Sequence, residues 1–218
     1  MKTPFFAVVA LALASAASSL AGTIYNNTTT DTLITYFYSV GPSSQIGDSI
    51  TLGGTDRTLT DAAIQFYNLG SSAGTFTATL TFWNVGGPVG SQIGASYVLN
   101  GISINALDIL TVNFGSLNLL VPNNLIFTVG VSNVTAGLDL GLNAFEPPSV
   151  GSSNNASIIT GVTSGLVTNF TASSTAVGEG NLYLRLEATT IPEPSTIAMS
   201  AGGALLALFA AAHKRNRK

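Results

Sequence analysis

The chain has 218 residues, of which 46% are hydrophobic and only 8% are charged, and its formal net charge is −3. It contains no cysteine, which excludes disulfides, Cys-based metal sites and Cys nucleophiles. Between Gly22 and Ile191 there are nine acidic residues, two arginines and no lysine. This segment therefore lacks the basic footprint of a nucleic-acid-binding protein, and we expect no nucleic-acid partner.

The N-terminus has the pattern of an export signal. Lys2 provides a charged start, and an apolar run follows from Phe5 to Ala14. Ser19-Leu20-Ala21 satisfies the small-x-small rule for signal peptidase, so residues 1–21 are predicted to be a signal peptide that is cleaved between Ala21 and Gly22. Ala14-Ser15-Ala16 is a competing cleavage site.

The segment from residue 22 to residue 190 is predicted to be a domain of short β-strands. Its clearest strand is Thr75 to Trp83, in which hydrophobic side chains alternate with threonines. The threonine face is expected to remain in contact with water. Similar alternation or β-rich composition marks other stretches, at residues 33–40, 49–52, 62–67, 96–99, 110–114, 125–131, 138–144, 157–160 and 182–187.

Nine to eleven short strands separated by Gly, Asn and Pro turns indicate an all-β fold. We expect an antiparallel β-sandwich, of jelly-roll type, with a substantial core.

The C-terminus carries three features in a fixed order. Pro192-Glu193-Pro194 must be extended, because proline fixes φ and lacks a backbone donor. An uncharged apolar run from residue 196 to residue 212 follows, near the lower length limit for a membrane-spanning helix. The chain then ends in a basic cluster that is expected to stay in the cytoplasm, formed by Lys214, Arg215, Arg217 and Lys218.

Residues 191–218 resemble the PEP-CTERM sorting signal, in which a Pro-Glu-Pro motif, a short membrane helix and a basic terminus occur in this order. The resemblance covers about the last 28 residues and concerns how the chain is handled. It implies processing by an exosortase, a membrane-embedded cysteine protease, and an association with exopolysaccharide or biofilm. A plain tail anchor is the alternative interpretation.

Side chains suited to catalysis are scarce in the segment between the two ends. The only histidine is His213, in the basic tail, so this segment has no imidazole for a catalytic triad or a metal site. Without lysine there is also no Schiff-base nucleophile. We therefore expect no enzyme, no cofactor and no metal. A carboxylate-dependent glycosidase is the less favoured alternative, since no spacing singles out a pair of acids.

Two further stretches are candidate sites. Asp56, Arg57 and Asp61 form the densest charged cluster, which is interpreted as an exposed turn with a local ion pair in preference to a calcium site. Trp83, the only tryptophan, is interpreted as a partly buried rim residue. The alternative is that Trp83, with Tyr67 or Tyr97, stacks on a sugar.

Together these features predict an exported bacterial protein of the cell envelope, surface or extracellular matrix, held briefly in the inner membrane. The body is expected to be a non-catalytic structural or adhesive module, with a glycan-binding module as the alternative.

Overall fold

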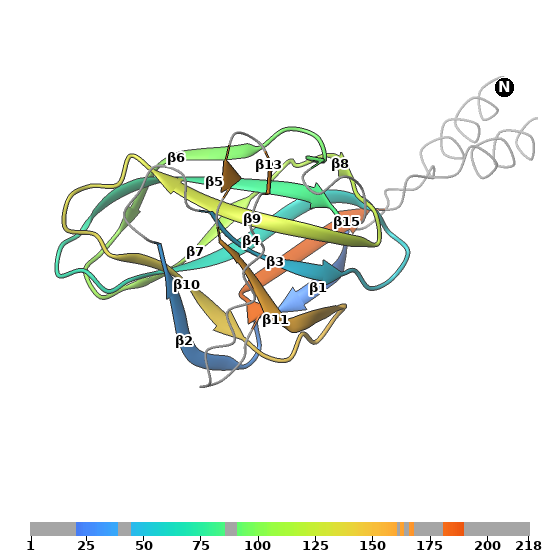
Figure 1. Cartoon of the computed structure of the whole chain (residues 1–218), viewed down its shortest axis with the longest axis horizontal. Coiled ribbons are helices and arrows are strands. Elements are labelled where there is room, and N and C mark those ends of the chain that lie inside the picture. The colour runs from blue at the N-terminus through green and yellow to red at the C-terminus, as the bar shows by residue number, and fades with distance from the viewer. Residues whose placement is uncertain are drawn as a thin grey trace, which may run out of the picture. The chain divides into compact units, whose positions relative to one another are not determined.

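Most of the strands form two antiparallel sheets whose inner faces share one core (Figure 1). The structure is a computed structural model of the whole chain, and it describes residues 21–38, 45–85, 91–160, 162–163, 166–167 and 181–189. The described residues contain no helix, and thus none that could cross a membrane. The expected membrane segment at 196–212 lies outside the described residues, as do the basic tail, the Pro-Glu-Pro motif and residues 1–20 of the signal peptide. Residues Ala21–Thr189 belong to one compact unit.

Sheet A, with eight strands, is built around the long strand β4. The order β1-β15-β4-β10-β14 forms its main path, while β7 and β8 pair with β4 and β2 pairs with β10. Its strands are β1 (Gly22–Asn27), β2 (Asp31–Phe37), β4 (Thr58–Asn68), β7 (Ile109–Phe114), β8 (Leu119–Leu120), β10 (Leu140–Phe145), β14 (Asn181–Leu182) and β15 (Leu184–Thr189).

Sheet B has five strands in the order β11-β3-β9-β5-β6, and they follow one another across the view in Figure 1. They are β3 (Gln45–Thr51), β5 (Gly74–Asn84), β6 (Tyr97–Ile104), β9 (Asn124–Ser132) and β11 (Ser152–Thr160). A separate two-stranded sheet pairs β12 (Val162–Thr163) with β13 (Leu166–Val167).

The core forms where the alternating apolar positions of the two sheets meet. Phe66 on β4 and Phe76 on β5 contact each other across the sheets, with ring centroids 4.9 Å apart. Burial of such large side chains is the main favourable term in folding. The all-β prediction is therefore confirmed for the described residues, and two antiparallel sheets are present.

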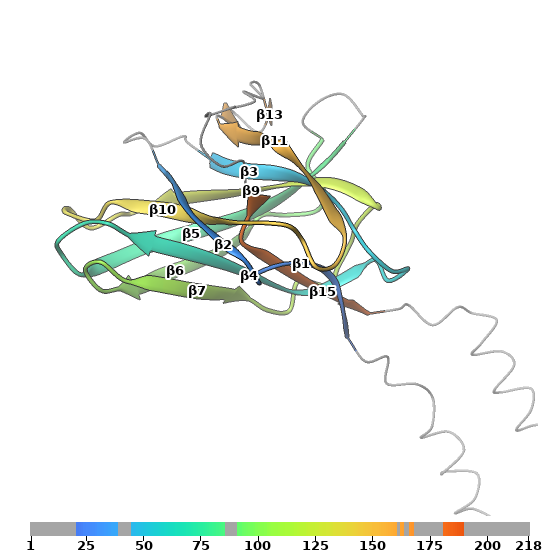
Figure 2. The same ribbon diagram turned by 90° about the horizontal axis from the view of Figure 1, so that it is seen from below.

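The first and last strands of the body are neighbours. β1 and β15 pair antiparallel, with Gly22 opposite Ala188, and they lie side by side at one edge of the fold (Figures 1 and 2). Strand β1 was not predicted from the sequence. Its side chains do not alternate cleanly between faces, because Ile24 and Tyr25 are both buried and the pairing with β15 shifts register between Thr23 and Tyr25.

The expectation of a wet threonine face on β5 is correct for only two of its four threonines, since Thr75 is exposed and Thr79 is partly exposed. Thr77 and Thr81 are both buried, as is Thr128 on the neighbouring strand β9. The Thr81 hydroxyl lies 2.9 Å from the Ser96 hydroxyl, so the buried polar group has a partner. The outer face of sheet B is therefore partly covered along β5.

Candidate functional site

Trp83 is not available to a ligand. Its side chain is 2% exposed, and its indole Nε1 donates a hydrogen bond to the Thr128 hydroxyl at 2.9 Å. The Thr128 hydroxyl in turn donates to the side-chain carbonyl of Gln45. A sugar can stack only on an exposed ring face, so this burial overturns both the glycan role considered for Trp83 and the expectation of a rim position.

The charged cluster at Asp56 is held by backbone carbonyls rather than by an ion pair. The Arg57 guanidinium donates to the carbonyl oxygens of Gly53, Gly54 and Asp56, and to the side chain of Asn123. The expected local ion pair is therefore wrong, since Arg57 ties down its own loop. Within the described ranges no group of three or more His, Cys, Asp or Glu side chains is placed to hold a metal ion.

A set of neighbouring apolar and amide side chains, several of them at least partly exposed, lies on the outer face of sheet A. Phe66 points into the core, so its neighbour Tyr67 points outward. Cross-strand pairing places Gly141 between Phe37 and Tyr67, and Ile109 on the far side of Tyr67. We call Phe37, Tyr67 and Ile109 the apolar row.

The apolar row is open to solvent. Phe37 is 38% exposed and Ile109 is 50% exposed, while Tyr67 is partly exposed. The Phe37 and Tyr67 rings have centroids 6.4 Å apart and planes inclined at 54°. Gly141 permits this approach, because a Cβ at this position would lie 3.0 Å from Phe37 Cδ1 and 2.9 Å from the Tyr36 carbonyl oxygen.

A second row of polar side chains runs beside the apolar row. The Thr35 hydroxyl donates to Asn143 Oδ1 at 2.7 Å, and Asn143 Nδ2 donates to Gln65 Oε1 at 2.9 Å. Thr111 pairs with Gln65 across β4 and β7 and is exposed. We call Thr35, Asn143, Gln65 and Thr111 the amide row. Its internal hydrogen bonds fix the orientation of both amides. Asn143 itself is buried, whereas Thr35 and Gln65 are partly exposed.

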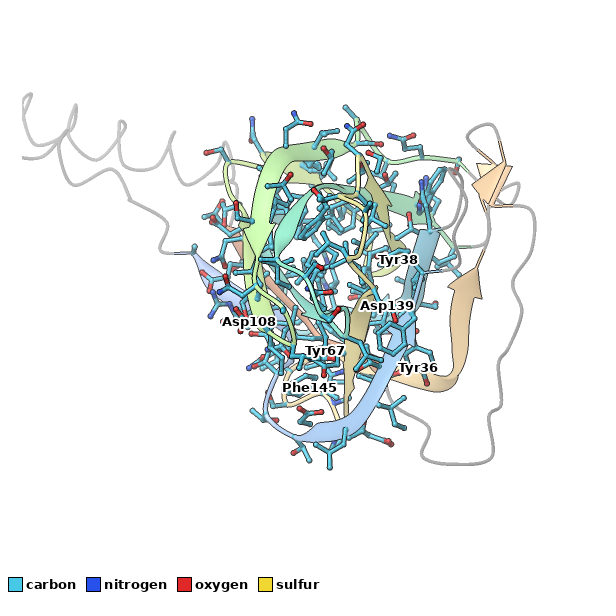
Figure 3. All side chains as sticks on the ribbon, turned by 90° about the vertical axis from the view of Figure 1, so that its left-hand side faces the viewer. Tyr36, Tyr38, Tyr67, Asp108, Asp139 and Phe145 are labelled. Carbon is cyan, nitrogen blue, oxygen red and sulfur yellow. The ribbon has the colours of Figure 1, made fainter. Side chains whose placement is uncertain are left out.

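Few charges lie on or near these two rows. The backbone carbonyl oxygens of Asp108 and Asp139 accept hydrogen bonds from the backbone N–H groups of Asn68 and Leu69. Asp108 and Asp139 therefore flank the end of β4 beyond Tyr67 (Figure 3). Arg185 projects from the same face, further along, and its Nε lies 3.5 Å from the Glu187 carboxylate. Asp61 pairs with Glu187 at that same far end and is exposed. The face is therefore uncharged along the rows and carries acidic residues at both ends.

A carboxyl group lies inside the core, at a position that the alternating sequence pattern alone assigns to a hydrophobic residue. Asp48 on β3 is 1% exposed, and its neighbours on the same face are Ile46 and Ile50. Its carboxyl accepts hydrogen bonds from the Ser49 backbone at 2.7 Å and from the Ser153 hydroxyl at 2.9 Å.

Burial raises the pKa of Asp48 to about 8, and the hydrogen bonds from Ser153, Ser49 and the Leu182 backbone act in the opposite direction. Desolvation, and to a smaller extent the nearby Asp48, also raises the pKa of the buried Tyr25 hydroxyl. A raised carboxyl pKa is typical of general acids. Asp48, however, is sealed between the sheets, where no substrate reaches it, so we interpret it as part of the core.

Tyr67 was a candidate from the sequence, but its partners Phe37 and Ile109 were not. Tyr67 alternates with Phe66, which reveals its outward direction, whereas Phe37 lies about 30 residues earlier in the chain. Only the cross-strand register through Gly141 brings the two rings together. The pairing register of these strands cannot be predicted from one sequence.

No family model, no curated protein and no solved structure matches this chain.

Proposed function

We propose that this chain is an exported protein of the bacterial cell envelope, surface or extracellular matrix, sorted by its C-terminal segment. Signal peptidase removes residues 1–21, and the segment 196–212 then holds the chain in the inner membrane of a Gram-negative-type cell. An exosortase processes it near Pro192-Glu193-Pro194. The observation that carries the proposal is the order of motif, apolar run and basic end at the C-terminus, with an export signal at the opposite terminus.

The position of the strands is compatible with both cleavages. β1 begins at Gly22 and β15 ends at Thr189, so cuts after Ala21 and near Pro194 fall outside both sheets. Because Gly22 pairs with Ala188, the two ends of the body leave from the same edge. Neither cleavage would remove a strand from the fold.

In this proposal the body is a non-catalytic structural or adhesive module, with a sandwich of jelly-roll type, and its partner outside the cell is exopolysaccharide. The support is compositional and chemical. Between Gly22 and Ile191 the chain has no histidine, lysine or cysteine, and the apolar row and the amide row on the outer face of sheet A carry no charged side chain.

The sorting motif can be tested by substitution in the producing cell. We expect Pro192→Ala combined with Pro194→Ala to leave the protein in the membrane fraction at full length, because the extended motif is what the protease recognises. Ser195→Ala, next to the motif, is the matched control and should be released normally. Release of the double variant at the wild-type rate, measured by immunoblotting membrane and medium fractions, would contradict the proposal.

A further inference from the structure

We propose that the apolar row and the amide row together bind a strand of an uncharged polysaccharide on the outer face of sheet A. The inference rests on the proposed function in one respect, since an exported body is one that meets polysaccharide. It goes further by naming the binding face and the class of ligand.

The apolar row matches the faces of sugar rings. A pyranose ring presents C–H groups on its faces and hydroxyl groups around its edge. Aromatic side chains combine a large contact area with a π-face that attracts such partly positive hydrogens. Phe37 and Tyr67 present two inclined rings at neighbouring positions, and Ile109 extends the apolar surface beyond them. A polymer lying along the row can therefore contact more than one ring.

The amide row matches the edges of those sugars. The oxygen of the Gln65 amide is occupied by Asn143 Nδ2, which fixes the amide plane. Its two N–H donors have no hydrogen-bond acceptor in the described part of the chain, and the Gln65 residue is partly exposed beside Tyr67. The exposed Thr111 hydroxyl continues the row. Oriented donors and acceptors next to stacking rings fix the position of a bound ligand.

Charge decides which polymer fits. The two rows carry no charge, while Asp108 and Asp139 lie at one end of the face and Asp61 at the other. Arg185 is paired with Glu187, so it offers little attraction to an anion. A polyuronate, an anionic lipid surface or a nucleic acid would be repelled by the acidic ends, whereas a neutral glycan would not.

A second copy of the chain is a poorer occupant. A standard protein–protein interface involves roughly 20–30 residues on each partner. In the described part of the chain, the exposed or partly exposed apolar side chains around the rows are Phe37, Tyr67 and Ile109, with Leu69 and Leu107 at the end of the face and Leu33 on β2. This patch is small for a stable dimer, but its size suits one strand of a polymer.

The test is affinity electrophoresis of the full chain in mild detergent, through native gels containing dextran, hydroxyethylcellulose or, as the anionic probe, alginate. We expect at least one neutral polymer to retard the wild-type protein and alginate to have no effect. Phe37→Ala and Tyr67→Ala should each weaken binding about tenfold, which corresponds to the loss of one stacking contact. Gln65→Leu nearly keeps the volume and removes the donors, together with the oxygen that accepts from Asn143 Nδ2, and it should weaken binding about fivefold.

Leu120→Ala is the matched control, because Leu120 is an exposed apolar residue of sheet A outside both rows. It should leave retardation unchanged. The circular dichroism spectrum and the melting temperature of each variant identify any variant that fails to fold. If an aromatic variant fails to fold, Gln65→Leu still tests the proposal.

Three outcomes would overturn the proposal: no retardation of the wild type by either neutral polymer, retardation by alginate alone, or retardation that Phe37, Tyr67 and Gln65 substitutions do not change. A concentration-dependent dimer in sedimentation velocity that Tyr67→Ala abolishes would assign the face to self-association instead. None of these results bears on release from the membrane, so failure of the glycan site is distinguishable from failure of the sorting proposal.

Discussion

Asp48→Asn is expected to make the protein more stable than the wild type at pH 9 while leaving stability almost unchanged at pH 4. Asn has nearly the same shape as Asp, and its amide can keep the contacts with the Ser49 backbone and the Ser153 hydroxyl. It cannot ionise. The variant therefore removes the cost of a buried negative charge without opening a cavity.

The direction in which the stability of the wild type changes with pH follows from proton binding to Asp48. Burial raises the pKa of Asp48 from its ordinary 3.8 to about 8 in the folded protein. Between these values the unfolded chain has lost the proton and the folded chain has kept it, so the free energy of unfolding falls as the pH rises. Each pKa unit corresponds to about 1.4 kcal/mol, so the stability gap at pH 9 should reach several kcal/mol.

Urea unfolding at pH 4, 6, 8 and 9 measures this gap as the difference between wild type and variant. The difference should grow up to about pH 8 and then level off. Asp139→Asn, which removes one charge from an exposed position, controls for net charge. A difference that is independent of pH would show that the Asp48 carboxyl titrates alike in the folded and unfolded chains.

The second large effect is expected at Asn27, on the edge strand β1. Its side chain is fully buried, and Nδ2 lies 3.0 Å from the Phe145 carbonyl oxygen, 3.0 Å from that of Asn181 and 3.1 Å from that of Leu182. One amide therefore ties β1 to β10 and β14. Asn27→Ala leaves these buried acceptors without their donor, which is costly inside a protein.

We expect Asn27→Ala to lower the free energy of unfolding by about 2–4 kcal/mol, which corresponds to a fall in melting temperature of roughly 5–15 °C. The loss is limited because the Asn27 Oδ1 is itself buried without a hydrogen bond within the described part of the chain, and its removal relieves that cost. Asn113→Ala, at an exposed position of β7, is the matched control. A shift for Asn27→Ala as small as that of the control would mean that the amide does not hold the strands together.

Much of the fold was predictable because the core strands alternate regularly. Ala62, Ile64 and Phe66 on β4 and Leu182, Leu184 and Leu186 at the C-terminal end of the body are all buried, as their period of two indicated. The structure has fifteen strands in the described residues, and β8, β12, β13 and β14 contain only two residues each. Strands that short carry too few residues to show a period.

The buried polar residues and the aromatic pair could not be predicted, because they depend on which side chains of other strands pack against them. Asp48 occupies an inward position that the pattern assigns to a hydrophobic side chain, and its carboxyl is satisfied there by hydrogen bonds from the Ser153 hydroxyl on β11 and from backbone groups. Trp83 and Thr81 have the alternation of outward residues but are covered by other parts of the fold. The pair formed by Phe37 and Tyr67 depends on the register of three strands.

The central claim, export followed by sorting cleavage, is tested most directly by the masses of the terminal peptides of mature protein, with membrane-bound and released material measured separately. The account predicts released protein that starts at Gly22 and ends near Pro194. An intact Lys218 on all of the protein, with none released, would contradict it and make the C-terminal segment a permanent anchor.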